Sequence, residues 1–171
     1  FLPMSAEGGG EYGGYTRLAT LLEEQRKRPA VLADGSAVQG PTVTLDAGDF
    51  SMGSLFQTIY ATDAPELRAL GAMGYDATTL GNHEFDYRAA GLADMLRAAV
   101  ASGEALPALV QANYKPPESD ADSWDAWNAY GVTDYVVIEK ERESREGPAE
   151  PVRVAVFGVL GVDADECAPM S

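Results

Sequence analysis

The stretch that decides the fold reads Gly74-Tyr75-Asp76-Ala77-Thr78-Thr79-Leu80-Gly81-Asn82-His83-Glu84-Phe85-Asp86. Residues 76–80 are short and contain β-branched and aliphatic side chains, which is typical of a strand. Residues 81–86 then form a loop that holds an amide, an imidazole and two carboxylates. The next apolar residues, at positions 92, 95, 96, 99 and 100, follow the period of a helix. The stretch therefore predicts a strand, a polar loop and a helix in succession.

A second polar loop precedes this one and has the same setting. Residues 42–46 predict another short strand, and Ala47-Gly48-Asp49-Phe50 follows it as a loop. Asp49 and Asn82 are 33 residues apart, which is enough for one strand–helix–strand crossover. Ligands in open α/β sheets gather beyond the carboxyl ends of the strands. We therefore expect the two loops to lie side by side at one edge of a sheet.

The polar residues of these loops each have an ordinary structural explanation as well. Asp49 alone is explained by a helix N-cap, and His83 alone by a loop histidine bonded to the backbone. Neither explanation accounts for site-type residues at matching positions in both loops. A carboxylate, an amide oxygen and an imidazole that converge would form part of a shell suited to divalent metals.

The rest of the chain predicts an α/β fold. The Gly-rich run at 5–14 is expected to be a loop that leads into a helix over about 14–28. Further strands are expected at residues 108–112, 135–138 and 152–157, and the charged segment 139–150 is expected to be an exposed hairpin tip. No internal repeat or domain boundary is visible. We predict a single domain over 1–171, a sandwich whose mixed β-sheet is flanked by helices.

The composition excludes several classes of protein. The chain has 12 Lys and Arg against 27 Asp and Glu, a formal net charge of −15, which argues against sequence-independent nucleic-acid binding and against docking on anionic lipid. Cys167 is the only cysteine and His83 the only histidine, so a zinc site with several Cys or His ligands is excluded from this chain alone. A metal site here must use oxygen ligands or be incomplete. No apolar run is long enough to span a bilayer.

These motifs resemble those of a known family. Gly48-Asp49, followed by Gly81-Asn82-His83-Glu84, is the central signature of the calcineurin-like metallophosphoesterases. The wider set of motifs, in the same order along the chain, is similar to the N-terminal domain of bacterial 5′-nucleotidases. That set comprises Gly13-Gly14-Tyr15, Asp46 to Asp49, Gly74 to Asp86, and Val110 to Asn113. The likeness covers most of the chain.

The resemblance implies roles for four residues. Asp49 would bridge two divalent metals, and Asn82 would bind the second metal through its side-chain oxygen. His83 would contact the phosphate or the leaving group, while Asp86 would orient and charge that imidazole. The implied reaction is in-line attack of a metal-activated hydroxide, which converts a nucleoside monophosphate or related nucleotide to nucleoside and phosphate. The metals are expected to be drawn from Zn, Mn, Mg, Ca and Fe, and Glu84 is given only a structural role.

The chain also departs from the family. The family places an Asp-x-His pair ahead of the Gly-Gly-Tyr helix and a Gly-His-x-His further downstream, and this sequence contains neither. It also begins without Met, so we expect a domain truncated at both ends, with an incomplete fold and site, with or without a bound ion. We expect the fragment itself to have little or no phosphatase activity. The resemblance further implies a separate C-terminal substrate-binding domain, and an extracytoplasmic location (periplasmic, secreted or cell surface), although the chain shows no signal peptide.

Other functions stay open at this point. One is a non-catalytic α/β binding module on the same scaffold that has lost its metals. Another is a metallophosphoesterase relative that acts on cyclic nucleotides or nucleotide sugars, or on sulfur- or lipid-linked esters. An upstream Asp-x-His and a downstream Gly-His-x-His in the flanking sequence would favour the enzyme over the module.

Overall fold

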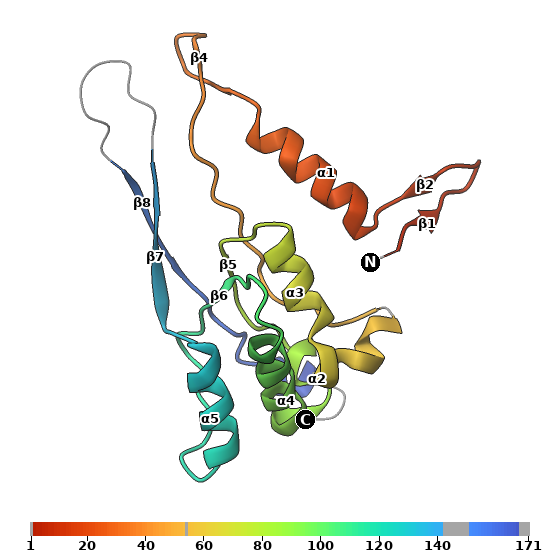
Figure 1. The fold of residues 1–171 in the computed structure, drawn as a ribbon, viewed down its shortest axis with the longest axis vertical. Coiled ribbons are helices and arrows are strands. Elements are labelled where there is room, and N and C mark those ends of the chain that lie inside the picture. Colours follow the sequence, from red (N-terminus) through yellow and green to blue (C-terminus); the bar gives the residue numbers. More distant parts are fainter. Residues whose placement is uncertain (1, 54, 142–150, 168–171) are drawn as a thin grey trace. The chain divides into compact units, whose positions relative to one another are not determined.

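The computed structural model describes residues 2–53, 55–141 and 151–167 (Figure 1). Its contacts divide the chain into two compact units, residues 1–43 with 138–154 and residues 44–137 with 155–171. The second unit contains the buried apolar side chains and the candidate site. The two units are described separately, and the single domain over 1–171 stays a prediction.

The first unit contains one helix and two short hairpins. Helix α1 spans Tyr15–Arg26. The remaining elements are β1 (Met4–Ser5), which pairs antiparallel with β2 (Glu11–Tyr12), and β3 (Ala30–Val31), which pairs antiparallel with β4 (Ala37–Val38). The Gly-rich run that predicted a plain loop therefore carries a hairpin. Three successive glycines at 8–10 have positive φ, which lets the chain reverse there.

The second unit is built on neighbouring parallel segments. Strand β5 (Ala77–Thr78) pairs in parallel with β6 (Ala108–Leu109), and Leu45 forms a parallel bridge to Ala77. The strand predicted over 42–46 is thus reduced to a bridge, although the Asp76 backbone N–H still donates to the Thr44 carbonyl (2.8 Å). Parallel neighbours joined by helical crossovers confirm the predicted α/β class.

The second unit also contains seven described helices. They are the 3₁₀ helices η1 (Leu55–Ile59) and η2 (His83–Phe85), with α2 (Tyr60–Asp63), α3 (Pro65–Ala72), α4 (Arg88–Ala101), α5 (Ala121–Tyr130) and α6 (Ala164–Cys167). Helix α4 packs against α2 and α5. It buries Leu92, Met95, Leu96 and Ala99, as their spacing predicts, whereas Val100 is 41% exposed.

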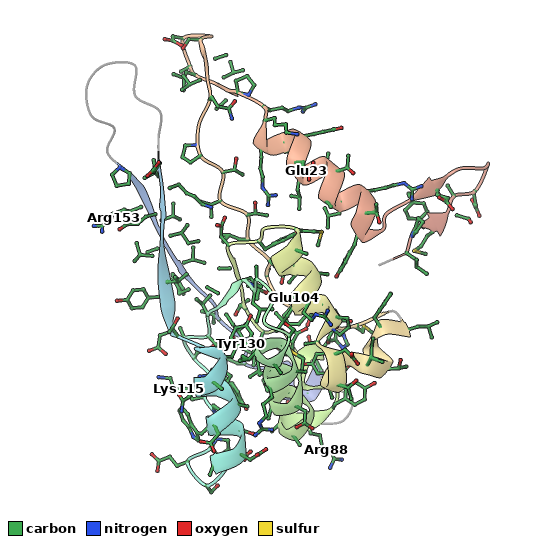
Figure 2. All side chains as sticks on the ribbon, viewed as in Figure 1. Glu23, Arg88, Glu104, Lys115, Tyr130 and Arg153 are labelled. Atoms are coloured by element: carbon green, nitrogen blue, oxygen red, sulfur yellow. The ribbon has the colours of Figure 1, made fainter. Side chains whose placement is uncertain are left out.

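Helix α5 has clear end signals. Asp120 caps its N-terminus by accepting the Ser123 backbone N–H (3.1 Å), and Gly131 ends it in the left-handed conformation. The Tyr130 hydroxyl, near the end of this helix, donates to the Pro107 carbonyl (2.8 Å; Figure 2). The Tyr130 bond joins α5 to the chain segment that leads into β6.

Two longer strands, β7 (Tyr135–Lys140) and β8 (Val152–Phe157), form a two-stranded sheet. Most of the charged segment predicted as a hairpin tip, residues 142–150, lies outside the described residues. Within the part of the chain that the structure describes, no helix is long and apolar enough to cross a membrane.

Candidate functional site

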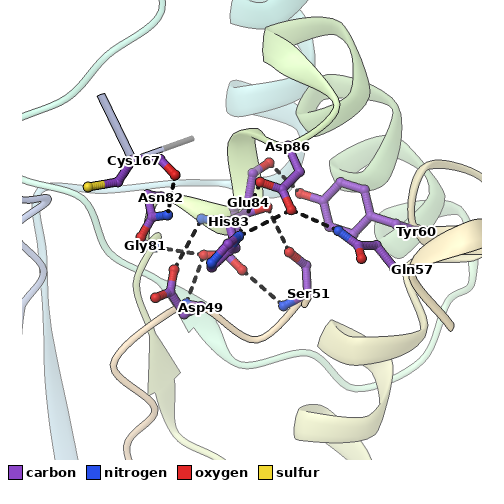
Figure 3. A network of polar contacts seen from close by, with 10 residues as sticks. All are labelled: Asp49, Ser51, Gln57, Tyr60, Gly81, Asn82, His83, Glu84, Asp86 and Cys167. Carbon is purple, nitrogen blue, oxygen red and sulfur yellow. Dashed lines mark hydrogen bonds and ion pairs between the residues drawn. The ribbon is translucent and has the colours of Figure 1, made fainter. Parts of the chain in front are cut away.

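The two polar loops meet in the second unit. One follows the bridge at Leu45 and the other follows β5, which places both at the same end of neighbouring parallel segments. The backbone N–H of His83 donates to Asp49 Oδ1 (3.1 Å; Figure 3). The Asp49 residue is exposed and Asn82 is half-buried. The convergence of the loops that the chain spacing predicts is therefore observed.

Two glycines allow the loops to touch. A Cβ atom on Gly48 would lie 2.6 Å from the Gly81 nitrogen, and a Cβ atom on Gly81 would lie 2.1 Å from Asp49 Oδ1. Both distances are far below van der Waals contact. Gly48 (φ 89°) and Asp49 (φ 58°) also occupy the left-handed region, which a glycine adopts freely and an aspartate tolerates. This backbone turn brings the Asp49 carboxylate against the Gly81 loop.

A buried carboxylate lies beneath both loops. Glu84 is fully buried and accepts three backbone N–H groups, from Asp49 (2.9 Å) and Gly81 (2.6 Å) on Oε2 and from Ser51 (3.1 Å) on Oε1. Burial raises the pKa of Glu84, and the three N–H donors act in the opposite direction. The structural role expected for Glu84 is thus a specific one, because its two oxygens join one loop to the other.

Two hydroxyl groups donate hydrogen bonds to the backbone carbonyls of η2. The Ser51 hydroxyl donates to the His83 carbonyl (2.8 Å), and the Tyr60 hydroxyl donates to the Glu84 carbonyl (2.9 Å). Tyr60 is almost fully buried, and this burial raises the pKa of its hydroxyl well above the ordinary value. The carbonyl groups of this short turn are therefore paired inside the protein.

The His83 imidazole pairs with a carboxylate and not with the backbone. Its Nδ1 lies 3.1 Å from Asp86 Oδ1 and 3.2 Å from Oδ2, and Gln57 Nε2 donates to Asp86 Oδ2 (2.8 Å). The side chains of His83 and Asp86 keep exposed fractions of 19% and 12%. Because Asp86 occupies Nδ1, the ring presents Nε2 to a ligand.

Asn82 lies beside Asp49 in the site and has its amide nitrogen engaged. Its Nδ2 donates to the Cys167 carbonyl in α6 (3.2 Å), and the amide oxygen is the atom left for a ligand. Carboxylate and amide oxygens suit a hard divalent cation. Among the described residues, no group of three or more His, Cys, Asp and Glu is arranged to hold a metal. Asp49 and Asn82 therefore fit part of a metal shell.

Known proteins match the chain both in sequence and in structure. No protein-family profile matches it. Over 86 residues, 49% of this chain, it is 41% identical to a 5′-nucleotidase of Bos taurus. Over 150 residues, 86% of this chain, it is 26% identical to a 2′,3′-cyclic-nucleotide 2′-phosphodiesterase/3′-nucleotidase of Haemophilus influenzae. The matched stretches span only 13% and 20% of these relatives.

Solved structures agree on the fold. The 5′-nucleotidase precursor of Thermus thermophilus superposes with a TM-score of 0.64 over 96% of this chain and 26% of its own, at 24% identity. The calcineurin-like phosphoesterase YfkN of Bacillus subtilis gives 0.61 over 95% of this chain and 46% of its own, at 22% identity. The chain is similar in sequence to 5′-nucleotidases over about half its length, and it has the calcineurin-like phosphoesterase fold.

The resemblance drawn from the sequence motifs is thus confirmed by these sequence matches and by the fold. The structure also adds residues that sequence reasoning did not single out, namely Ser51, Gln57 and Tyr60, each bonded to the Gly81–Asp86 loop. Their spacing in the sequence does not identify them as site residues, since they come from a segment that shows no site motif. Only the fold places them next to His83, Glu84 and Asp86.

Proposed function

We propose that this protein is a metal-dependent phosphoester hydrolase of the 5′-nucleotidase type. The observation that carries the proposal is the contact of the two loops, in which the His83 backbone bonds Asp49 while the His83 ring is paired with Asp86. The names of the relatives support nucleotides as the substrate class. Because the chain spans a small part of those relatives, the activity is proposed for the protein as a whole.

Asp49 and Asn82 would hold divalent metal in this proposal. Their oxygen atoms lie on adjoining loops, and the contacts of each leave one side-chain oxygen for a cation. We expect two divalent ions, which could each be Zn, Mn, Mg, Ca or Fe. When bound, the ions would lower the pKa of a water molecule and stabilise charge on the phosphoryl oxygens.

His83 would act on the substrate directly. With Nδ1 held by Asp86, its Nε2 is the nitrogen that can donate to a phosphoryl oxygen or to the leaving oxygen. Asp86 would fix the orientation of the ring, and Gln57 in turn orients Asp86. His83 is the catalytic residue here, and Asp86 acts through it.

The substrate and location are proposed from the relatives. Nucleoside monophosphates are favoured by the 5′-nucleotidase matches, and cyclic nucleotides or dinucleotides by relatives named a cyclic-nucleotide phosphodiesterase and a NAD nucleotidase. A separate substrate-binding domain is proposed for the whole protein. An extracytoplasmic location is proposed as well, supported by a relative from snake venom.

The test is metal analysis and a hydrolysis screen on the longest natural form of the protein. AMP and 2′,3′-cyclic AMP would be offered with each metal, to the wild type and to Asp49→Ala and His83→Ala. Hydrolysis that needs metal and falls in both variants supports the proposal. Unchanged activity in both variants removes the site assignment, and no hydrolysis with any metal favours the binding module. We expect little activity from residues 1–171 alone, and robust hydrolysis by that chain would overturn this expectation.

A further inference from the structure

Glu84 joins three points of the backbone that belong to two different loops. Its Oε2 accepts the N–H groups of Asp49 and Gly81, and its Oε1 accepts that of Ser51. Asp49 and Ser51 lie in the first loop and Gly81 in the second. These bonds join segments 33 to 35 positions apart in sequence, apart from the local one to Gly81. A single side chain therefore ties the loops together beneath the site.

A carboxylate suits this task better than other side chains. It offers two oxygens with about four acceptor positions and no donor, which matches three converging N–H groups. A glutamine in the same place has one oxygen, and its NH₂ group would face at least one N–H donor. A buried N–H that loses its partner destabilises the folded loop. The arrangement consequently depends on the chemistry of the group as well as on its volume.

The hydrogen bonds of Glu84 hold the backbone next to the functional side chains. The Asp49 residue that donates to Glu84 also accepts the His83 N–H, and Gly81 is the neighbour of Asn82. Moving the first loop away from Glu84 would therefore move the Asp49 carboxylate relative to the Asn82 oxygen. The bond of the Ser51 hydroxyl to the His83 carbonyl reinforces the same junction.

We infer that Glu84 is a positioning residue, which sets the place of the Asp49 carboxylate relative to Asn82 and His83 through three backbone N–H groups. The loop-joining part of this inference stands on the hydrogen bonds alone. Its consequence for metal binding rests on the proposed function.

The chain provides a matched control. Glu66 in α3 is also buried, with 1% of its surface exposed, but within the described residues neither of its oxygens has a hydrogen-bond partner. Glu66→Gln thus removes a buried carboxylate without breaking a tie between loops. Glu84→Gln removes a carboxylate of the same size that holds three N–H groups.

The first experiment measures amide hydrogen exchange by NMR in the wild type and both variants. In the wild type, the N–H groups of Asp49, Ser51 and Gly81 should be protected. In Glu84→Gln, protection should fall at these positions, while the Val110 N–H, bonded to the Thr78 carbonyl in the core, stays protected and reports the intact fold. Glu66→Gln should leave all of them protected. The inference is wrong if these wild-type amides exchange as freely as the amides of open loops. It is also wrong if the amides stay protected in Glu84→Gln. The wild-type measurement decides the first point even if that variant folds poorly.

The second experiment titrates Mn²⁺ and follows the broadening of the Asn82 and His83 signals. The apparent Mn²⁺ affinity should fall roughly tenfold or more in Glu84→Gln, as for other groups that orient ligands, and stay unchanged in Glu66→Gln. Loss of amide protection with unchanged Mn²⁺ affinity would overturn the positioning role. If the wild type does not bind Mn²⁺ at these residues, the proposed metal function fails, and the exchange measurement alone decides whether Glu84 joins the loops.

Discussion

At the scale of single residues, the pair of His83 and Asp86 carries the clearest test of mechanism. Asp86→Asn keeps the shape of the side chain but removes the charge that faces Nδ1 (3.1 Å). We expect kcat to fall roughly 10- to 100-fold with a small change in KM, because the ring loses the partner that fixes its orientation. Steady-state kinetics of nucleotide hydrolysis across pH would measure the effect.

The matched control for this substitution is Asp94→Asn. Asp94 pairs with Arg97 in α4 (3.1 Å), and 61% of its side chain is exposed. The Asp94→Asn variant should keep the kcat of the wild type. Equal losses in both variants would mean that Asp86 has no special role, and an unchanged kcat in Asp86→Asn would argue against its action through His83.

Glu66 is a residue-scale feature that affects stability. Burial raises the pKa of Glu66 from its ordinary value of 4.5 to about 7. The folded state therefore holds its proton where the unfolded state has lost it, and the free energy of unfolding falls as pH rises from about 4.5 to about 7. Above that window the loss stays constant. We expect Glu66→Gln to be more stable than the wild type by about 1–3 kcal/mol at pH 8, and nearly equal to it at pH 4.5.

Urea unfolding at several pH values would test this expectation. The difference between Glu66→Gln and the wild type should widen through the window and then level off. A difference that is the same at pH 4.5 and pH 8 would show that Glu66 does not titrate abnormally in the folded protein.

At the scale of elements, the contact between the two loops depends on Gly48. Gly48→Ala should destabilise the loop, because the new Cβ would meet the Gly81 nitrogen at 2.6 Å and the φ of 89° is unfavourable for alanine. Gly53 is a close control, since it has the same φ of 89° but no atom of the described residues within 4 Å of its hypothetical Cβ. Gly53→Ala isolates the backbone strain from the steric overlap.

We expect Gly48→Ala to lower the free energy of unfolding by about 1–3 kcal/mol more than Gly53→Ala, which is the usual cost of overpacking. Its Mn²⁺ binding at Asn82 should weaken as well. Thermal or urea unfolding with the NMR titration would measure both. Equal destabilisation by the two substitutions would mean that the loops relax without cost and that their contact is not tight.

Some of the helices and strands follow from sequence patterns, and others do not. Helix α4 was predictable because four apolar residues recur at helical spacing and lie buried on one side. Residues 42–46 form a single bridge where the pattern predicts a strand, because the backbone partners of a strand are supplied by another part of the chain. The Gly-rich hairpin was missed for a similar reason, since its residues carry no apolar alternation.

At the scale of the whole molecule, residues 1–171 contribute a formal net charge of −15, which should repel anionic substrates of the longest natural form. We expect kcat/KM for a dianionic nucleotide monoester to rise as ionic strength increases from about 10 mM to about 150 mM, because salt screens this repulsion. The effect should be smaller for bis(p-nitrophenyl) phosphate, which carries one negative charge. A fall of kcat/KM with salt for the monoester would instead indicate that local cations dominate the field at the site.

The sequence by itself determined the order of strand, polar loop and helix and the family resemblance, and it predicted the four site residues Asp49, Asn82, His83 and Asp86. These follow from local patterns and from residue types that keep their chemistry wherever they lie. Only the tertiary structure decided that Glu84 joins the two loops and that Gln57 holds Asp86. Both arrangements link segments about 30 residues apart. Such contacts arise when the crossover brings parallel segments together, and no local period encodes them.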